Sequence, residues 1–473
     1  MVRDALAEHE RIRGKYGARL RERDALSTSA EVDPQRAEDE PPLHGAHRPH
    51  SPVYVWYVIL LLFAVNVFNY VDRMALAVLS PSIKADLDLS DGGLGLLVGF
   101  AFFLFYALCG IPIARHADKG IRRNIIAVAL ATWSVMTALS GAAQNFWHLF
   151  IARVGVGSGE AGCIPPAQSL ICDYVPPRRR SGVFAFHNFG LIAGMMVGMA
   201  LAGQLGELIG WRWTFVALGV PGLGLAMLVR LTLREPARGH FDHEGSAGLS
   251  LRKTLSILWS CKTYRLLMTF SVVNGFVQYG VTQWWPSFYS RSFGLGMSSV
   301  GTYLGFAIGL GSAIGMLVGG MVANRVARRD VKLPLLISAA STTLALPTAL
   351  GSLVAATIST SVVCVAMTAM FWSVSAGPSI AALYSVVTAR MRATAGAMTI
   401  FVVAVFGYGL GPFCVGVLSD SLTPVFGMQG LRNALFVPVS LLPLAALALC
   451  MAATALPAEL RRMNTESRAL AAE

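Results

Sequence analysis

Long apolar runs recur along this chain from Val53 to its C-terminal region. A helix needs about 20 mainly apolar residues to cross the hydrocarbon core of a bilayer. The pattern therefore predicts an all-α membrane protein with twelve transmembrane helices. The predicted segments are 53–79, 93–115, 123–142, 147–171, 181–206, 213–233, 264–290, 299–323, 333–354, 359–388, 393–421 and 431–453.

The composition favours a polytopic membrane protein over a soluble one. Hydrophobic residues make up 55% of the chain and charged residues 14%, whereas a soluble domain carries about 25% charged residues. The net charge of +12 does not indicate nucleic-acid binding, because Lys and Arg cluster in alternate short loops. The seven cysteines have no CxxC spacing, so we expect neither a metal site nor another resident cofactor.

The positions of the basic residues predict the orientation of the chain. Cytoplasmic loops of membrane proteins carry an excess of Lys and Arg. The even number of segments then places both termini in the cytoplasm. The basic loops contain Arg115, Lys119, Arg122 and Arg123; Arg178 to Arg180; Arg230 to Lys253; Arg325 to Lys332; Arg390 and Arg392; and Arg461 and Arg462, whereas the opposite loops contain Lys84, Arg212, Arg291 and Arg432.

The chain divides into two halves that resemble each other. We predict a cytoplasmic tail at 1–52, a six-helix bundle at 53–233, a cytoplasmic linker at 234–263, a second bundle at 264–453 and a tail at 454–473. The first tail is expected to be disordered, or to contain a short amphipathic helix at 11–24. The sequence from Pro166 aligns with that from Pro378, and the sequence from Ala114 with that from Gly320. A parallel duplication of this kind places the substrate site between the halves.

Four charged residues lie inside otherwise apolar segments of the first half: Asp72, Arg73, Arg153 and Glu160. A charge at the bilayer centre costs roughly 3 kcal/mol or more and usually marks a substrate or proton path. Helix geometry puts Asp72 and Arg153 at a similar depth, so we expect these two to pair. Glu160 is then less well neutralised. Because a low dielectric disfavours the charged carboxylate, we expect Glu160, with Asp72, to exchange protons. The alternative is a static ion-pair network.

Further polar and aromatic residues extend this pattern. Asn66 and Asn69 share a helix face with Arg73. The second half offers amides and aromatic rings instead of charges. An aromatic wall opposite a charged wall suits an amphiphile with a polar head and a long tail, although such rings often serve helix packing or the membrane-interface belt. The predicted cavity-lining residues of the second half are Asn274, Gln278, Tyr279, Phe371, Trp372 and Tyr408.

Charged residues at the cytoplasmic ends of the segments suggest a gate. Ion pairs that break and re-form during alternating access would need such groups, whereas a plain positive-inside anchor is the alternative. The predicted cytoplasmic gate consists of Asp118, Lys119, Arg122, Arg123, Arg178, Arg180, Arg390 and Arg392.

Glycine rows predict close helix contacts. Small residues at regular spacing let transmembrane helices approach each other. One row contains Gly155, Gly157, Gly159 and Gly162, and a second contains Gly190, Gly194 and Gly198. Gly407, Gly409 and Gly411 are expected to loosen the eleventh segment.

These motifs resemble those of the major facilitator superfamily, and within it the spinster group. FNYVDRMALAVLSPSI, from Phe68, resembles that group's first-helix motif, and RVGVGSGEAGCIPPAQSLICDYVPPRRRSG, from Arg153, resembles its fourth-helix motif. The loop after the second segment resembles the superfamily signature, but it has Ala114 at the glycine position and one residue fewer before Arg122. The second copy has Asn324 where Asp is usual.

The resemblance implies two six-helix bundles that rock in alternating access. It also implies export of sphingolipid signals or lysophospholipids, in some members linked to protons. The family's first-helix Asp and Arg carry over onto Asp72 and Arg73, and its fourth-helix Arg and Glu onto Arg153 and Glu160. We expect a monomer in the plasma (inner) membrane of a bacterium, with the bilayer and a small-molecule or lipid substrate as its partners.

The sequence as a whole predicts a secondary transporter, not an enzyme, that couples protons to the export of an amphiphile. Two alternatives are a proton-coupled organic-anion symporter and a multidrug/proton antiporter. An intramembrane enzyme would need a nucleophile–base pair or metal ligands at bilayer depth, and the sequence offers neither. A non-transporting sensor would lose stability but no flux when the buried charges are removed.

Overall fold

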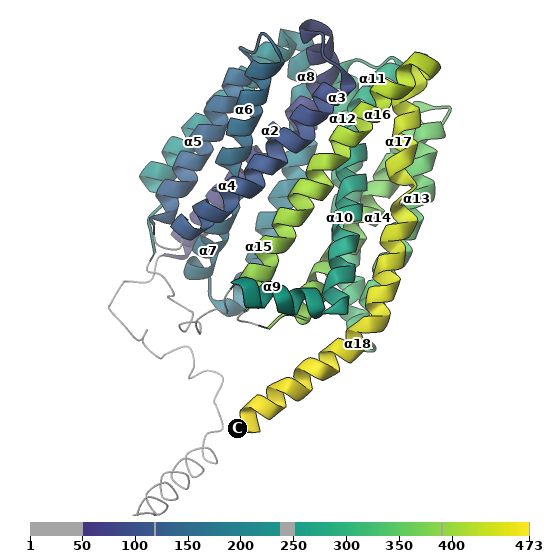
Figure 1. Cartoon of the computed structure of the whole chain (residues 1–473). Helices are drawn as coiled ribbons and strands as arrows, with labels where there is room; N and C mark the ends of the chain where they lie inside the picture. Colours follow the sequence, from purple (N-terminus) through teal and green to yellow (C-terminus); the bar gives the residue numbers. More distant parts are fainter. Residues whose placement is uncertain (1–50, 118–119, 237–250, 389–390, 473) are drawn as a thin grey trace, which may run out of the picture. The chain divides into compact units, whose positions relative to one another are not determined.

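Helices joined by short turns make up the computed structural model, which describes residues 51–117, 120–236, 251–388 and 391–472 (Figure 1). These described residues contain no strand. His50–Glu473 forms one compact unit. The helices are α2 (Pro52–Leu87), α3 (Asp91–Gly95), η2 (Leu96–Phe100), α4 (Ala101–Ala117), α5 (Arg122–Ser140), α6 (Phe146–Glu160), α7 (Ile164–Tyr174), α8 (Pro177–Thr232), α9 (Leu251–Ser260), α10 (Lys262–Thr282), α11 (Trp285–Phe293), α12 (Met297–Ala327), α13 (Leu333–Val354), α14 (Ile358–Ser385), α15 (Arg392–Val402), η4 (Val403–Gly409), α16 (Leu410–Phe426), η5 (Gly427–Gln429), α17 (Gly430–Val439) and α18 (Leu442–Ala472).

Eight helical stretches among the described residues are long and apolar enough to cross a membrane. Two of them, Pro177–Thr232 with 56 residues and Thr394–Met463 with 70, are much longer than one crossing requires. Within the first, Gly210 has a non-helical backbone (φ 78°, ψ 162°), so α8 is two helical runs joined by a kink. The number of twelve crossings stays a prediction.

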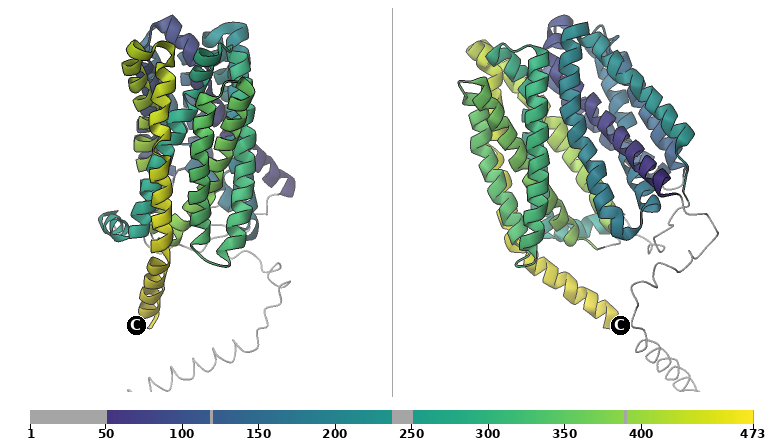
Figure 2. Two further views of the ribbon diagram at one scale, coloured as in Figure 1. Left: turned by 90° about the vertical axis from the view of Figure 1, so that its right-hand side faces the viewer. Right: turned by 180° about the vertical axis from the view of Figure 1, so that it is seen from behind.

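The helices run between two sides of the bundle (Figure 2). We call the side at which α2 begins, at Pro52, the tail side, and the side at which α2 ends, at Leu87, the far side. The turn between α2 and α3 and the start of α12 lie on the far side. The start of α5 and the helix α9 lie on the tail side.

Some element boundaries differ from those that hydropathy predicts. The helix α2 continues eight residues past the predicted end at 79, through Pro81, and ends at Asp88 in the left-handed conformation (φ 49°). These extra residues are more polar, so an apolar-run criterion leaves them out although the helix continues. The predicted linker contains the helix α9, and α18 continues to Ala472. The tail at 1–50 lies outside the described residues.

Glycines set the close contacts inside the first half, as predicted. A Cβ atom at Gly194 on α8 would lie 2.5 Å from the carbonyl oxygen of Val67 on α2. A Cβ atom at Gly157 on α6 would lie 2.5 Å from the carbonyl oxygen of Phe102 on α4. Real Cβ atoms do not come this close, so only glycine permits these backbone contacts.

The two halves of the described chain, 51–236 and 251–472, contact each other through helices α8 and α12, through α3 and η2 against α16, and through α4 against η4. A Cβ atom at Gly305 on α12 would lie 2.7 Å from the carbonyl oxygen of Met196 on α8. The π-helical segments η2 and η4 meet at Gly99 and Gly409. The glycine-rich part of the eleventh predicted segment therefore departs from α-helical geometry, in agreement with the sequence.

Candidate functional site

Six polar residues of the first half are buried at the level of the central helix contacts. Exposed fractions of the α2 residues Asn66, Asn69, Asp72 and Arg73 lie between 1% and 6%, and those of the α6 residues Arg153 and Glu160 are 2% and 0%. Glu160 is the last residue of α6, where the chain breaks its helix before Pro165 and Pro166 begin α7.

Arg73 and Glu160 form the central ion pair. The Nε atom of Arg73 donates to Oε2 of Glu160 at 2.6 Å. This pairing corrects the sequence prediction that Asp72 pairs with Arg153 and that Glu160 is the less neutralised carboxylate. Adjacent residues on a helix differ by only 1.5 Å in depth but by about 100° in direction. Depth alone therefore could not decide which member of the Asp72–Arg73 dipeptide faces Glu160.

Of the two central carboxylates, Asp72 has no ion pair with a described residue, whereas Glu160 has one. The charges of Glu160 and Arg153 act on Asp72, and the donors of Trp133 and Thr137 on α5 approach it. Its Oδ1 atom nevertheless makes no hydrogen bond, and neither do Trp133 Nε1 and Thr137 Oγ1. The residue is thus a buried acid with nearby donors but no cation bound to it.

Several further polar atoms around the ion pair have no partner among the described residues. They are both side-chain polar atoms of Asn69, Nη2 of Arg73, Nε of Arg153 and Oε1 of Glu160. Buried polar atoms are nearly always hydrogen-bonded in proteins, and several unpaired ones in a single place indicate a site that binds something polar. Two free guanidinium donors suit an anionic group.

Aromatic rings surround the two guanidinium groups. The Phe102 ring contacts both of them, with its centroid 4.9 Å from Arg73 Cζ and 5.1 Å from Arg153 Cζ. The rings of Tyr70 and Tyr106 also lie close to Arg73, at 4.8 and 5.2 Å. Such cation–π contacts stabilise a cation away from water, so both arginines can stay charged at this depth.

The second half contributes two tyrosines to this group. Tyr279 on α10 and Tyr408 on η4 stack with ring centroids 4.4 Å apart. Both contact the ring of Phe103, at 5.0 and 5.4 Å. The charged residues of the first half therefore face an aromatic surface of the second half.

The other predicted cavity-lining residues lie in different surroundings. Asn66 Nδ2 donates to the carbonyl oxygen of His187, at 2.7 Å, and so joins α2 to α8. Asn274 and Gln278 on α10 are half-buried, and Asn274 Oδ1 has no hydrogen bond. Trp372 is buried in the far-side core, 5.8 Å from the ring of Trp285, and Phe371 packs against the same core.

The predicted gate residues on the tail side interact within the first half. Arg122 is 2% exposed and donates to Asp173 and to Glu235, the latter at 2.7 Å. Arg123 donates to the carbonyl oxygen of Leu233. These contacts fix the start of α5 to α7 and to the residues after α8, which fits an anchor inside one half.

Three of the remaining members of the predicted gate, Arg178, Arg180 and Arg392, lie among the described residues. Arg180 donates to the carbonyl oxygens of Val175 and Cys172, in its own half. Arg178 and Arg392 are exposed. The predictions for Asp118, Lys119 and Arg390 fall outside the described residues.

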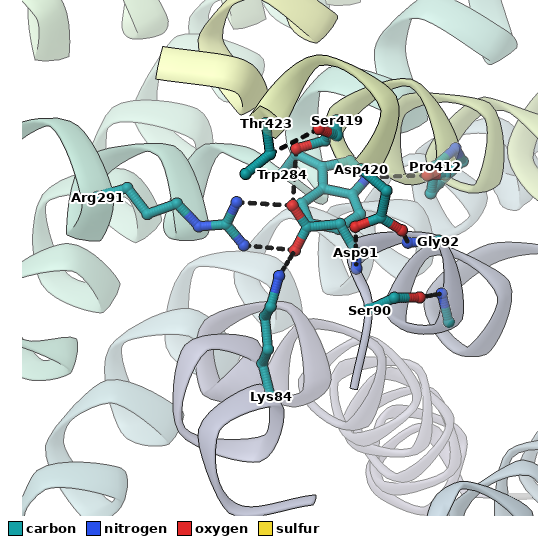
Figure 3. A network of polar contacts seen from close by, with 11 residues as sticks. Lys84, Ser90, Asp91, Gly92, Trp284, Arg291, Pro412, Ser419, Asp420 and Thr423 are labelled. Carbon is teal, nitrogen blue, oxygen red and sulfur yellow. Dashed lines mark hydrogen bonds and ion pairs between the residues drawn. The ribbon is translucent and has the colours of Figure 1, made fainter. Parts of the chain in front are cut away.

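Among the described residues, an ion pair between the halves lies on the far side (Figure 3). Asp91 is 1% exposed and accepts both Nη atoms of Arg291, at 2.5 and 2.7 Å, together with Lys84 Nζ. The sequence analysis counted Lys84 and Arg291 only as loop charges and missed Asp91. The available signal was Ser90–Asp91, an N-cap motif directly before an apolar run.

A family model described as the Major Facilitator Superfamily matches residues 62–412, which is more than half of the chain. The chain belongs to the Major Facilitator Superfamily. As a member of this superfamily it is a secondary transporter and a multi-pass integral membrane protein, not an enzyme.

Individual members of the superfamily are similar over most or part of this transporter. An MFS-type efflux pump of Mycolicibacterium smegmatis is 35% identical over 401 residues, which are 84% of this chain and 91% of the relative. A probable L-galactonate transporter of Escherichia coli is 28% identical over 258 residues, 51% of this chain and 56% of the relative. The transporter thus spans about half the length of this second relative.

A solved structure is similar over nearly its full length. It is the crystal structure of a bacterial homologue of the human lysosomal transporter Spinster, in an inward-facing and unoccupied conformation. The superposition has a TM-score of 0.78 with 27% sequence identity and covers 86% of this transporter and 99% of that chain. The expected resemblance to the spinster group is confirmed.

Proposed function

We propose that this transporter exports an amphiphile in exchange for protons, and that the head group of this amphiphile carries both an anionic group and an amine. Lysophospholipids with an amine head and phosphorylated sphingoid bases have this chemistry. The tail side would face the cytoplasm of a bacterial cell. The observation that carries the proposal is that the two buried carboxylates differ: Glu160 is ion-paired, whereas Asp72 is not.

Asp72 would be the residue at which proton and substrate exclude each other. A substrate amine binds an ionised carboxylate, and protonation removes the negative charge that attracts it. By linkage, the proton then weakens substrate binding as much as the substrate weakens proton binding. Such mutual exclusion is what coupled exchange in opposite directions requires.

The anionic part of the head group would bind the two arginines. Arg73 Nη2 and Arg153 Nε are buried donors without a partner. A phosphate that bridges them would lie next to the Phe102 ring, which contacts both guanidinium groups. Charge-assisted hydrogen bonds of this kind are stronger than neutral ones.

The apolar tail would lie along the aromatic rings. Phe103, Tyr279 and Tyr408 form a contiguous group that joins the two halves next to the arginines. Export is further supported by the similarity to an MFS-type efflux pump.

Co-transport of an organic anion with a proton is a second candidate, and one observation favours it. Arg73 is held by Glu160. Protonation of Glu160 would free Arg73 for a substrate carboxylate, so proton and anion would bind together and move in the same direction. The similarity to a probable L-galactonate transporter agrees with this reading.

The direction of proton movement distinguishes the two candidates. The protein is reconstituted into liposomes that contain a pH-sensitive dye, and either a lysophospholipid with an amine head or galactonate is added outside. Exchange predicts that the interior becomes alkaline when the lysophospholipid enters. Co-transport predicts that the interior becomes acidic when galactonate enters. Protein-free liposomes set the substrate concentration below which the dye does not leak.

Three variants test which carboxylate carries the proton movement. Asp72→Asn should abolish proton movement under exchange, and Glu160→Gln should abolish it under co-transport. Asp86→Asn is the matched control, because Asp86 is an exposed far-side carboxylate whose partners, Trp211 and Arg212, belong to its own half. Full lysophospholipid-driven alkalinisation in Asp72→Asn would contradict the proposed exchange.

A further inference from the structure

Asp420 on α16 caps a helix that belongs to the opposite half. Its Oδ1 atom accepts the backbone N–H of Asp91 at 2.9 Å, and its Oδ2 atom accepts that of Gly92 at 2.7 Å (Figure 3). These amides are in the first turn of α3, where a helix leaves its N–H groups without internal partners. The next amide, Gly93 N–H, is bound by the helix's own N-cap residue, Ser90. We call this arrangement the Asp420 contact.

Next to the Asp420 contact, the ion pair between Asp91 and Arg291 also crosses between the halves. The Asp91 side chain binds Arg291 of α11 and accepts a hydrogen bond from Ser419 of α16, at 2.7 Å. With Lys84 the group contains two cations and two carboxylates, so its charges balance. Because Asp91 is 1% exposed, separation from its cations would leave a buried charge without a partner, which is costly.

Glu207 on α8 makes a corresponding contact in which the carboxylate belongs to the first half and the bound amide to the second half. Its Oε2 atom accepts the backbone N–H of Ser298 at 2.8 Å, in the first turn of α12. The N-cap residue of α12 is Gly296, which has no side chain to cap the helix. The first half therefore supplies the cap for a helix of the second half. We call this arrangement the Glu207 contact.

The internal duplication relates the two contacts. The alignment of Ala114 with Gly320, continued back without gaps, pairs Gly92 with Ser298, which are the residues whose amides are bound. The same alignment pairs the glycines that follow in α3 and η2 with those that follow in α12. The pairs are Gly95 with Gly301 and Gly99 with Gly305.

The paired glycines also make equivalent packing contacts between the halves. A Cβ atom at Gly95, Gly99, Gly301 or Gly305 would lie less than 3 Å from a backbone oxygen of the opposite half. Glu207 and Asp420 differ by one position, because the alignment of Pro166 with Pro378, continued forward, pairs Glu207 with Ser419. Each contact thus joins a carboxylate near the far end of one helix to the capped and glycine-rich start of another.

We propose that the Asp420 and Glu207 contacts are two duplicated closures of the far side, and that both must release before the halves separate there. Each carboxylate loses its amide donors on separation; α12 then loses its side-chain cap, whereas α3 keeps only the bond from Gly93 N–H to Ser90. The coupling arises because both contacts join the same two halves, so weakening one makes release of the other easier. The inference concerns one step of the alternating access in the proposed function, but its test needs no substrate or proton gradient.

Hydrogen exchange of backbone amides measures this release directly. The full-length protein in lipid nanodiscs is exposed to deuterated buffer, and exchange is followed in peptides that cover 89–96 and 296–303. Exchange of amides that are protected by a contact reports the population in which the contact is open. We compare wild type with Asp420→Asn and Glu207→Gln. Asp86→Asn is the matched control, because its ion pair with Arg212 lies within the first half.

The proposal predicts that each of the two variants accelerates exchange in both peptides, by roughly tenfold for the loss of a hydrogen bond to a charged group. The control should leave both peptides unchanged. Faster exchange only in the helix that the substituted carboxylate caps would show two independent local caps and overturn the proposal. Unchanged exchange in both peptides would overturn it as well. Glu207 is exposed, so Glu207→Gln is expected to fold and keeps the test decisive if Asp420→Asn does not.

Discussion

The ion pair between Arg73 and Glu160 should show strong energetic coupling. The two atoms lie 2.6 Å apart, and the side chains are 6% and 0% exposed. At an effective dielectric constant of 20 their attraction is about 6 kcal/mol. Removing two charges from water costs several kcal/mol per ion, so the pair as a whole adds little net stability. Removing one partner alone leaves a buried charge and costs about 3–5 kcal/mol.

A double-mutant cycle measures this coupling. The variants are Arg73→Met, Glu160→Gln and the combination of both, and the quantity is the free energy of unfolding in mixed micelles with a denaturing detergent. Each single variant should lose about 3–5 kcal/mol, and the double variant should lose less than either single variant. The coupling energy should then be about 3 kcal/mol or more.

A second cycle on Asp86 and Arg212 is the control. Both side chains are exposed by 40% or more, so solvent and salt screen their attraction and little coupling is expected. Additive losses for Arg73→Met and Glu160→Gln would refute the reasoning, because they would mean that the two charges do not stabilise each other. Coupling of equal size in both cycles would refute it too, because burial would then have no effect.

Two other predictions concern packing and the aromatic surface. Gly157→Ala should lower the thermal unfolding temperature, because the new Cβ atom would lie 2.5 Å from the carbonyl oxygen of Phe102, whereas Gly182→Ala, in open space, should leave the temperature unchanged or raise it. An equal decrease in both would contradict the proposed close contact. Tyr279→Ala should weaken binding of a long-tailed lysophospholipid at least about tenfold, as expected when a large aromatic contact is lost, and Tyr279→Phe should keep most of the affinity. Isothermal titration of the purified protein measures both, and equal losses would assign the role to the hydroxyl group.

The sequence predicted the fold class well because a membrane imposes strong constraints on composition. An apolar run of about 20 residues has few alternatives to a transmembrane helix. The glycine rows at Gly157 and Gly194 were equally informative, since close backbone contacts between helices allow no other residue. The break between α6 and α7 and the π-helical segment η2 were not predicted. They depend on contacts between helices rather than on the local pattern of polar and apolar residues.

The sequence located the charged site but not its pairing. Asp72, Arg73, Arg153 and Glu160 stand out because charges are rare in apolar segments. Their partners depend on the rotation of each helix, which depth does not reveal. The far-side residues Asp91 and Asp420 were missed for another reason. They lie at the ends of segments, where polar residues are normal, and their role depends on backbone amides of a distant helix that no side-chain pattern records.

The central site and the far-side contacts are joined by the same two helical runs. The run that begins with Asp91 continues through η2 to Phe102, and the run that contains Tyr408 in η4 continues to Asp420. In the first run, the π-helical segment η2 lies between Asp91 and Phe102. In the second run, the π-helical segment η4 contains Tyr408 and precedes Asp420. These segments meet at Gly99 and Gly409. Such turns often mark functional sites, because their hydrogen bonding is easily rearranged. Separation of the halves at the far side would therefore also change the packing of the rings around the arginines. The central site, which would bind substrate, and the contacts that would close the far side are therefore connected through the same two helical runs, although they lie far apart along each run.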